Sequence, residues 1–96
     1  MPYTLLYHPD IPRKDLPRIP RNVQSRIADA LALRLGESPE KYGQPLRGTL
    51  GGYWKLRVGD YRVVFKIVGD EVWILAILHR RQVYEDVARR IGWQPA

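Results

Sequence analysis

Seven consecutive apolar residues, Val72 to Leu78, constrain the fold of this 96-residue chain more than any other feature. A continuous apolar run of this length is typical of a strand buried on both faces of a sheet. It is followed at once by His79, Arg80 and Arg81, and Tyr84 comes shortly afterwards. We interpret the run as a rigid scaffold and the polar residues behind it as a site for phosphate.

The other segments predict one α+β domain over residues 1–96. A 3.6-residue spacing of apolar side chains indicates a helix from Pro20 to Leu35, with Gly36 as its stop. The segment 37–52 is rich in glycine and proline, which predicts a loop. The order β-α-α-β-β-β-α predicts an antiparallel sheet packed against a helix pair, with a short C-terminal helix. The expected elements are a strand at 3–7, helices at 10–16 and 20–35, strands at 53–58, 61–68 and 72–78, and a helix at 83–91. The last helix is expected to be anchored by Val83, Val87 and Ile91, and to end at Gly92.

Composition excludes several classes of protein. The chain has no cysteine, which removes disulfides, thiolate metal sites and cysteine nucleophiles. No apolar run approaches the roughly 20 residues of a membrane span, and a signal-peptide pattern is absent, so we expect a cytoplasmic protein without membrane contact. The net charge of +6 and the pI of about 10.0 favour a polyanionic or acidic partner.

Side chains alternate across a strand, so the two basic strands can be sorted by parity. The apolar sets of 53–58 and 61–68 are expected to face the helices together. The opposite face then carries four cations: Lys55, Arg57, Arg62 and Lys66. Like charges on neighbouring strands repel one another unless an anion lies between them. The alternative is solvation, or pairing with Asp60, Asp70 or Glu71, but these acids lie in turns and not on the face.

His79 and Arg80 are expected to leave the adjacent strand beside this basic face. A lone histidine is usually structural or solvated, but near several cations it acquires a second interpretation, because it exchanges a proton near neutral pH. Arginine binds phosphate through two hydrogen bonds, and lysine contributes a point charge. These groups suit binding and cleavage of a phosphodiester without metal. No carboxylate cluster or glycine-rich phosphate loop emerges, so we expect neither a metal nor a cofactor.

Two stretches, "LRGTLGGYWKLRVGDYRVVFKI" and "HRRQVYEDVARRI", span most of residues 46–91. They resemble the RelE/ParE superfamily of toxins from bacterial and archaeal toxin–antitoxin pairs, which implies the RelE-like microbial RNase fold. Members of the RelE branch enter the ribosomal A site and cut mRNA there without a metal. The resemblance therefore implies a type II toxin that acts as an endoribonuclease, or mRNA interferase, and arrests translation. Its reaction would be attack of a ribose 2′-OH on the adjacent phosphate, which leaves a 2′,3′-cyclic phosphate and a free 5′-OH.

The resemblance also implies roles for individual residues. Lys55 matches a strand lysine that assists proton transfer, and Arg62 matches the arginine that holds the scissile phosphate. Arg80 matches the arginine after the last strand, with Arg81 as an alternative. Tyr84 matches a tyrosine that stacks on a base or orients the nucleophile.

Some RelE proteins carry a second lysine on the first hairpin strand, where this chain has Tyr53 or Trp54. His79 stands where other members have a lysine or a glycine. We therefore expect His79 or Lys55 to relay the 2′-OH proton while Arg62 and Arg80 stabilise the transition state. Contacts with RNA and the ribosome are expected from Arg47, Arg57, Lys66 and Arg81.

Two other functions stay open at this point. The ParE branch of the same fold poisons DNA gyrase and cuts nothing itself, but its members generally lack the full set of basic residues. A non-catalytic module that binds nucleic acid is the other possibility. Either toxin interpretation implies an acidic protein antitoxin, and with it a hetero-oligomer in which the antitoxin neutralises the basic face.

Overall fold

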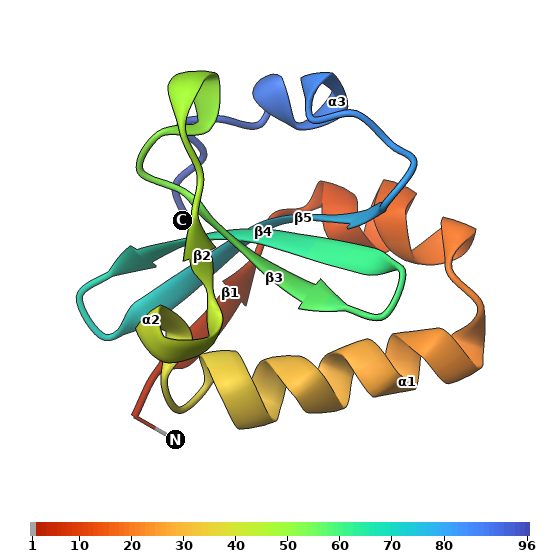
Figure 1. Ribbon diagram of the computed structural model, residues 1–96, viewed down its shortest axis with the longest axis horizontal. Helices are drawn as coiled ribbons and strands as arrows, with labels where there is room; N and C mark the ends of the chain where they lie inside the picture. Colours follow the sequence, from red (N-terminus) through yellow and green to blue (C-terminus); the bar gives the residue numbers. More distant parts are fainter. Residues whose placement is uncertain (1) are drawn as a thin grey trace.

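A five-stranded sheet organises the computed structural model of the protein, which describes residues 2–96 (Figure 1). The strand order is β1-β5-β4-β3-β2, and the strands β3, β4 and β5 form the expected antiparallel meander. β1 is parallel to β5, so the sheet is mixed. The strands are β1 (Thr4–Tyr7), β2 (Gln44–Pro45), β3 (Trp54–Val58), β4 (Tyr61–Val68) and β5 (Glu71–His79).

The apolar run forms most of β5, which lies between β1 and β4. Of its seven residues only Trp73 is more than slightly exposed, so burial on both faces is confirmed. The pairing with β4 shifts once within this run: Val64 lies opposite Ala76, but Phe65 lies opposite Ile74. Leu75 is thus an extra residue, a β-bulge that reverses the facing of the residues after it.

Two helical segments cover one face of the sheet. The first is a π-helical turn, Ile11–Asp15, followed by a 3₁₀ turn, Leu16–Arg18. The second is α1 (Arg21–Ala30), which continues as a π-helical segment, Leu31–Leu35, up to Gly36. The helix predicted for 20–35 is confirmed, and its apolar stripe lies in the main core. No helix among residues 2–96 combines the length and the apolar character that crossing a membrane requires.

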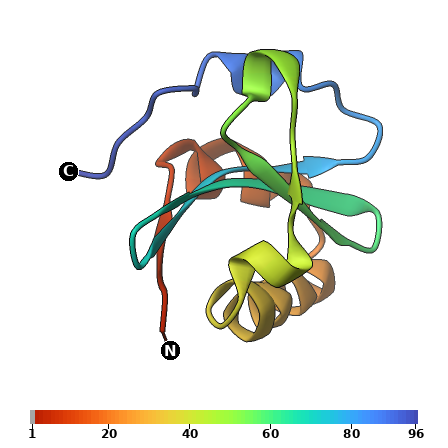
Figure 2. The same ribbon diagram turned by 60° about the vertical axis from the view of Figure 1, so that its left-hand side comes forward.

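The opposite face carries a second, smaller core, which the sequence did not reveal. Figure 2 shows the resulting layers, with α1 and α2 on one side of the sheet and α3 with the yellow-green segment near residue 50 on the other. The face predicted to be open and basic is therefore partly covered. The buried members of this second cluster are Leu50, Tyr53, Val64, Leu75, Ala76, Leu78 and Val87.

The segment predicted as a loop at 37–52 contains three short elements. They are α2 (Pro39–Tyr42), strand β2 and a 3₁₀ turn, Gly48–Leu50. Elements of two to four residues are too short to produce a periodic pattern, because periodicity needs several repeats to be recognised.

The C-terminal helix is shorter than predicted, since α3 spans only Glu85–Ala88. Val83, Val87 and Ile91 were expected to anchor it, but only Val87 is buried. Val83 is 57% exposed and Ile91 is 36% exposed, so that part of the prediction is wrong. Gly92 ends the segment with a φ of 88°, as its position predicted.

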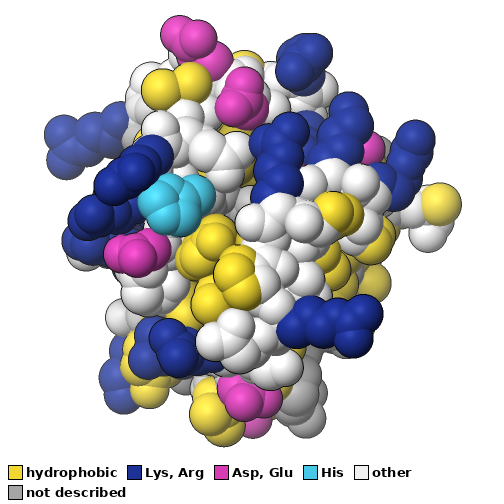
Figure 3. All heavy atoms as spheres, turned by 90° about the vertical axis from the view of Figure 1, so that its right-hand side faces the viewer, with side chains coloured by type: hydrophobic (Ala, Val, Ile, Leu, Met, Phe, Trp, Pro, Cys, Tyr) yellow, Lys and Arg dark blue, Asp and Glu magenta, His cyan; other side chains and the backbone are white. Residues whose placement is uncertain are grey.

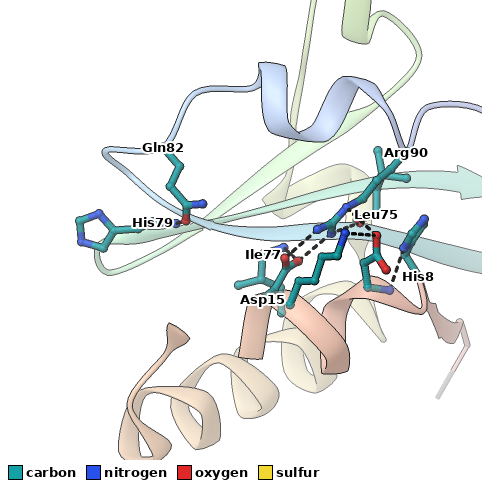
Figure 4. Close-up of polar contacts among 9 residues, drawn as sticks. His8, Asp15, Leu75, Ile77, His79, Gln82 and Arg90 are labelled. Atoms are coloured by element: carbon teal, nitrogen blue, oxygen red, sulfur yellow. Dashed lines mark hydrogen bonds and ion pairs between the residues drawn. The ribbon is translucent and has the colours of Figure 1, made fainter. Parts of the chain in front are cut away.

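Side-chain contacts fasten the C-terminal segment instead. Arg90 binds the buried Asp15 through two hydrogen bonds, from Nη1 to Oδ2 at 2.8 Å and from Nη2 to Oδ1 at 2.9 Å (Figure 4). The same Asp15 accepts a hydrogen bond from the N–H of Ile77, and Arg90 donates another to the carbonyl of Leu75 at the bulge. This pair hydrogen-bonds backbone groups of β5 past the end of β1, on the edge of β5 that faces away from β4.

Gly43→Ala should lower the free energy of unfolding by about 1–3 kcal/mol, the usual cost of an overpacked core. A Cβ at this position would lie 2.6 Å from Cζ of Phe65 and 2.9 Å from the carbonyl oxygen of Pro39. Phe65 is fully buried and cannot move aside. Urea denaturation measures the change, with the exposed Glu40→Ala as a control from the same turn. Equal stability of the two variants would contradict this expectation.

Candidate active site

Four cations lie on the sheet face opposite the helix pair, as their alternation predicted. β3 contributes Lys55 and Arg57, and β4 contributes Arg62 and Lys66. Arg57 lies directly opposite Arg62, so two guanidinium groups share one cross-strand pair. Like charges at directly opposite positions destabilise a sheet. An anion between them would remove that repulsion.

The acids in the turns do not neutralise these cations. Within residues 2–96, none of the four forms an ion pair. Asp60 instead contacts Arg80 at 3.7 Å, and Glu71 accepts a hydrogen bond from the indole of Trp73 at 3.0 Å. Lys66 lies 5.7 Å from the centre of the Tyr53 ring, which provides a cation–π contact. The remaining positive charge is available to an external anion.

Two buried polar atoms at this face lack any hydrogen-bond partner among the described residues: Nε of Arg62 and the hydroxyl of Tyr84. Buried polar groups in folded proteins are nearly always hydrogen-bonded, so each exception needs an explanation. The two residues lie on the same side of the sheet, because Leu78 is directly opposite Arg62 and belongs to the cluster against which Tyr84 packs. Each of these atoms can still donate one hydrogen bond.

The structure does not bring His79 together with Lys55 and Arg62. His79 is the last residue of β5 and lies opposite Tyr61, with 5.2 Å between the ring centres. Tyr61 packs against the helix-side core, so His79 is on the other side of the sheet from the four cations. Figure 4 shows its ring pointing away from the rest of β5.

The ring of His79 also has a local partner. Its Nδ1 accepts a hydrogen bond from the backbone N–H of Arg81 at 3.2 Å, and the backbone N–H of His79 donates to Oε1 of Gln82 at 2.8 Å. Acceptance at Nδ1 places the proton of the neutral ring on Nε2. The histidine is thereby built into the turn after β5, and its role as a proton carrier stays a prediction.

Three further arginines lie around this face and not in its centre: Arg47, Arg80 and Arg81. Arg80 and Arg81 are exposed in the turn after β5, and the backbone N–H of Arg80 donates to the carbonyl of Asp60 at 2.7 Å. Arg47 and Tyr84 line a hollow of about 270 Å³ between the 3₁₀ turn and α3. Lys and Arg side chains also flank a hydrophobic patch at one end of the molecule, with a histidine beside one group (Figure 3).

Three further residues lie near Lys55 and were not predicted from the sequence. Arg34, Tyr42 and Gln44 line a hollow of about 140 Å³ together with Lys55, Leu56 and Arg57. Two of them lie in the segment predicted as a loop, where no strand register could be assigned. Their proximity to Lys55 depends on β2, in which Gln44 pairs directly with that lysine. Within residues 2–96, no group of three or more His, Asp or Glu side chains is arranged to hold a metal ion.

The chain is similar to known toxins along most of its length. The family described as "ParE toxin of type II toxin-antitoxin system, parDE" matches residues 3–84. Toxin RelG of Mycobacterium tuberculosis is 31% identical over 86 residues, which are 88% of this chain and 98% of RelG. Toxin RelE of the same organism is 37% identical over 54 residues, 56% of each chain.

Solved structures show the same likeness. The toxin–antitoxin complex RelBE2 from Mycobacterium tuberculosis contains a chain that is 30% identical, with a TM-score of 0.76; the match covers 85% of this chain and 95% of that one. A mutant of the Escherichia coli toxin RelE in its free state has the same fold, with 23% identity, a TM-score of 0.70 and coverage of 95% and 99%.

Proposed function

The chain belongs to the ParE toxin family of type II toxin–antitoxin systems, within the RelE/ParE superfamily, and we propose that it acts there as a ribosome-dependent endoribonuclease. In this proposal it cuts mRNA in the ribosomal A site and so arrests translation. The observation that carries the proposal is the basic face around Arg62. There a buried guanidinium nitrogen has no hydrogen-bond partner among residues 2–96, and a second arginine stands directly opposite.

The proposed reaction needs only groups of this chain and of the RNA. A base takes the proton of the ribose 2′-OH, O2′ bonds to the adjacent phosphorus, and the bond from phosphorus to O5′ breaks. O5′ then receives a proton, which leaves a 2′,3′-cyclic phosphate and a 5′-OH. Arg62 binds the non-bridging oxygens as charge develops on them, since donors fixed before the reaction stabilise the transition state most effectively.

Other side chains assist from the rim of the same face. Arg57 stands directly opposite Arg62 and contacts the same phosphate. Arg80 closes on it from the exposed turn, where its contact with Asp60 is long at 3.7 Å. The Tyr84 hydroxyl, which has no partner within the described part of the chain, hydrogen-bonds the substrate while the Tyr84 ring stacks on a base.

The face on which each residue lies supports Lys55 over His79 as the group that moves protons. Lys55→Ala should lower the rate of mRNA cleavage by about 10²–10⁴-fold, the usual contribution of a general acid or base. His79→Ala should stay close to the wild-type rate, because His79 lies on the opposite side of the sheet. Single-turnover cleavage on programmed ribosomes measures both. A large loss in His79→Ala with an unchanged melting temperature would reverse the assignment, and full activity of both variants would refute it.

The decisive experiment incubates the purified protein with mRNA-programmed ribosomes and, separately, with DNA gyrase and plasmid. Cleaved mRNA ending in a 2′,3′-cyclic phosphate supports the proposal. Trapped DNA breaks without mRNA cleavage would support gyrase poisoning, the second candidate, which the match to the ParE toxin family favours. Salt-dependent binding of RNA with neither product would indicate a non-catalytic binding module.

We also propose a protein antitoxin as the partner, since the similar RelBE2 structure is a toxin–antitoxin complex. An apolar groove of about 380 Å³ lies between α1 and the π-helical turn, lined among others by Ile11, Leu16 and Ile27. An amphipathic antitoxin segment would bury its apolar side there, while its acidic side chains meet nearby cations. Co-expression with the neighbouring reading frame should restore growth and yield a complex that copurifies.

A further inference from the structure

A small hollow at the edge of β3 has the composition of an anion site. β2 pairs only with Trp54 and Lys55, so β3 continues past it with a free edge. α2 and the end of the long helix lie beside this edge. The hollow of about 140 Å³ is lined by Arg34, Tyr42, Gln44, Lys55, Leu56 and Arg57.

Every charged side chain that lines the hollow is positive. Arg34, Lys55 and Arg57 supply three cations, and no acid lines it. None of the three forms an ion pair within residues 2–96. A fourth cation contacts a lining residue, since Nζ of Lys41 lies 5.4 Å from the centre of the Tyr42 ring. The energetic cost of gathering these charges falls when an anion enters.

The hollow shares two residues with the candidate active site. Lys55 and Arg57 belong both to its lining and to the basic face, and Arg57 lies directly opposite Arg62. A polyanion held at Arg62 therefore reaches the hollow by crossing one strand. Arg34 comes from the long helix and Tyr42 from α2, so the track of positive charge leaves the sheet and continues around its edge.

We propose that this hollow is a second phosphate subsite, which binds the RNA backbone next to the scissile phosphodiester. The inference rests on the proposed function, because it takes RNA as the substrate at Arg62. The guanidinium of Arg34 forms two hydrogen bonds to phosphate oxygens, and the Tyr42 hydroxyl forms a third. Gln44 has both donors and an acceptor, which suits the adjacent ribose 2′-OH and favours RNA over DNA.

The test uses the full chain, a single-stranded RNA dodecamer and the same sequence in DNA, without ribosomes. Arg34→Ala should weaken RNA binding and reduce the slope of log K against log salt by about 0.7, the value for one phosphate contact on a single strand. Arg34→Lys should restore most of that slope, because it keeps the charge. Arg26→Ala is the matched control, since Arg26 is exposed on α1 and lies outside the hollow; it should bind like wild type.

Inorganic phosphate provides an independent probe. In NMR titrations it should shift the signals of Tyr42 and Gln44 in the wild-type protein and not in Arg34→Ala. The proposal is overturned if Arg34→Ala and Arg26→Ala have the same salt slope, if the wild-type protein binds no RNA, or if an acidic antitoxin peptide and not RNA depends on Arg34.

The two proposals fail in different ways. An unchanged salt slope in Arg34→Ala, with mRNA still cleaved on ribosomes by the wild-type protein, refutes the subsite alone. A reduced slope in Arg34→Ala, with no cleavage by the wild-type protein, refutes the nuclease and leaves an RNA-binding subsite.

Discussion

Arg62→Ala is expected to lower the rate of mRNA cleavage by about 10²–10³-fold, the cost of removing one donor that stabilises transition-state charge. The fold should tolerate the change. Nε of Arg62 makes no hydrogen bond within the described residues, so none at that atom is lost. The substitution also removes the repulsion between Arg62 and Arg57 across the strand pair. Expression of the variant should therefore no longer arrest growth, although the protein stays folded.

Two companions make this experiment specific. Arg62→Lys keeps the charge but loses the forked geometry, and should recover only part of the rate. Arg26→Ala removes an exposed arginine from α1 and should arrest growth like the wild type. Circular dichroism melting of all three separates loss of chemistry from loss of structure. If Arg62→Ala arrested growth as strongly as the wild type, the assignment of Arg62 to the active site would be refuted.

Asp15→Ala should lower the free energy of unfolding by about 3–5 kcal/mol, the cost of breaking a buried ion pair from one side. Its carboxylate is 5% exposed and the Arg90 side chain is 11% exposed. Hydrogen bonds that Arg90 donates to Asp15 raise the pKa of Arg90. The guanidinium stays charged when Asp15 is lost, because arginine is not deprotonated in proteins. The N–H of Ile77 loses its acceptor at the same time. Urea denaturation followed by tryptophan fluorescence measures the loss.

Asp10→Ala is the matched control, because its contact with Arg90 is longer, at 3.8 Å, and more exposed. It should cost less than about 1 kcal/mol. The double variant Asp15→Leu/Arg90→Met should regain much of the stability, since an apolar pair leaves no buried charge unpaired. If Asp15→Ala and Asp10→Ala were equally stable, the buried pair would not hold the C-terminal segment in place.

The strands of the meander were predictable because their runs of strand-forming residues are long and, in two of them, polar residues alternate with apolar ones. In β3 and β4 the cations at alternate positions show which side faces solvent. The run in β5 has no such marker, since all seven residues are apolar. A strict alternation from Val72 would place His79 on the basic face. The bulge at Leu75 reverses it, and no sequence pattern indicated that extra residue.

The second core was missed for a related reason. Leu50 and Tyr53 lie in or beside the segment expected to be a loop, and Val64 is the one apolar residue between Arg62 and Lys66 on its face of β4. None of these residues belongs to a sequence pattern that predicts a core, and only the fold packs them in one cluster with Val87. Tertiary packing also decided the C-terminal helix, where the spacing of Val83 and Ile91 is helical but neither residue finds a partner in the core.

The parallel pairing of β1 with β5 has a consequence for how the protein is made. Thr4 pairs with Glu71, and Asp15 binds Arg90, which lies 75 positions later in the chain. The first contact cannot form until Glu71 has left the ribosome that synthesises the chain, and the second cannot form until Arg90 has left it. Folding with such distant partners is slow, because loop closure precedes the stabilising contacts. A nascent chain that ends before Arg90 lacks the contact that fastens the segment behind Tyr84, so an unfinished toxin is held short of its native structure.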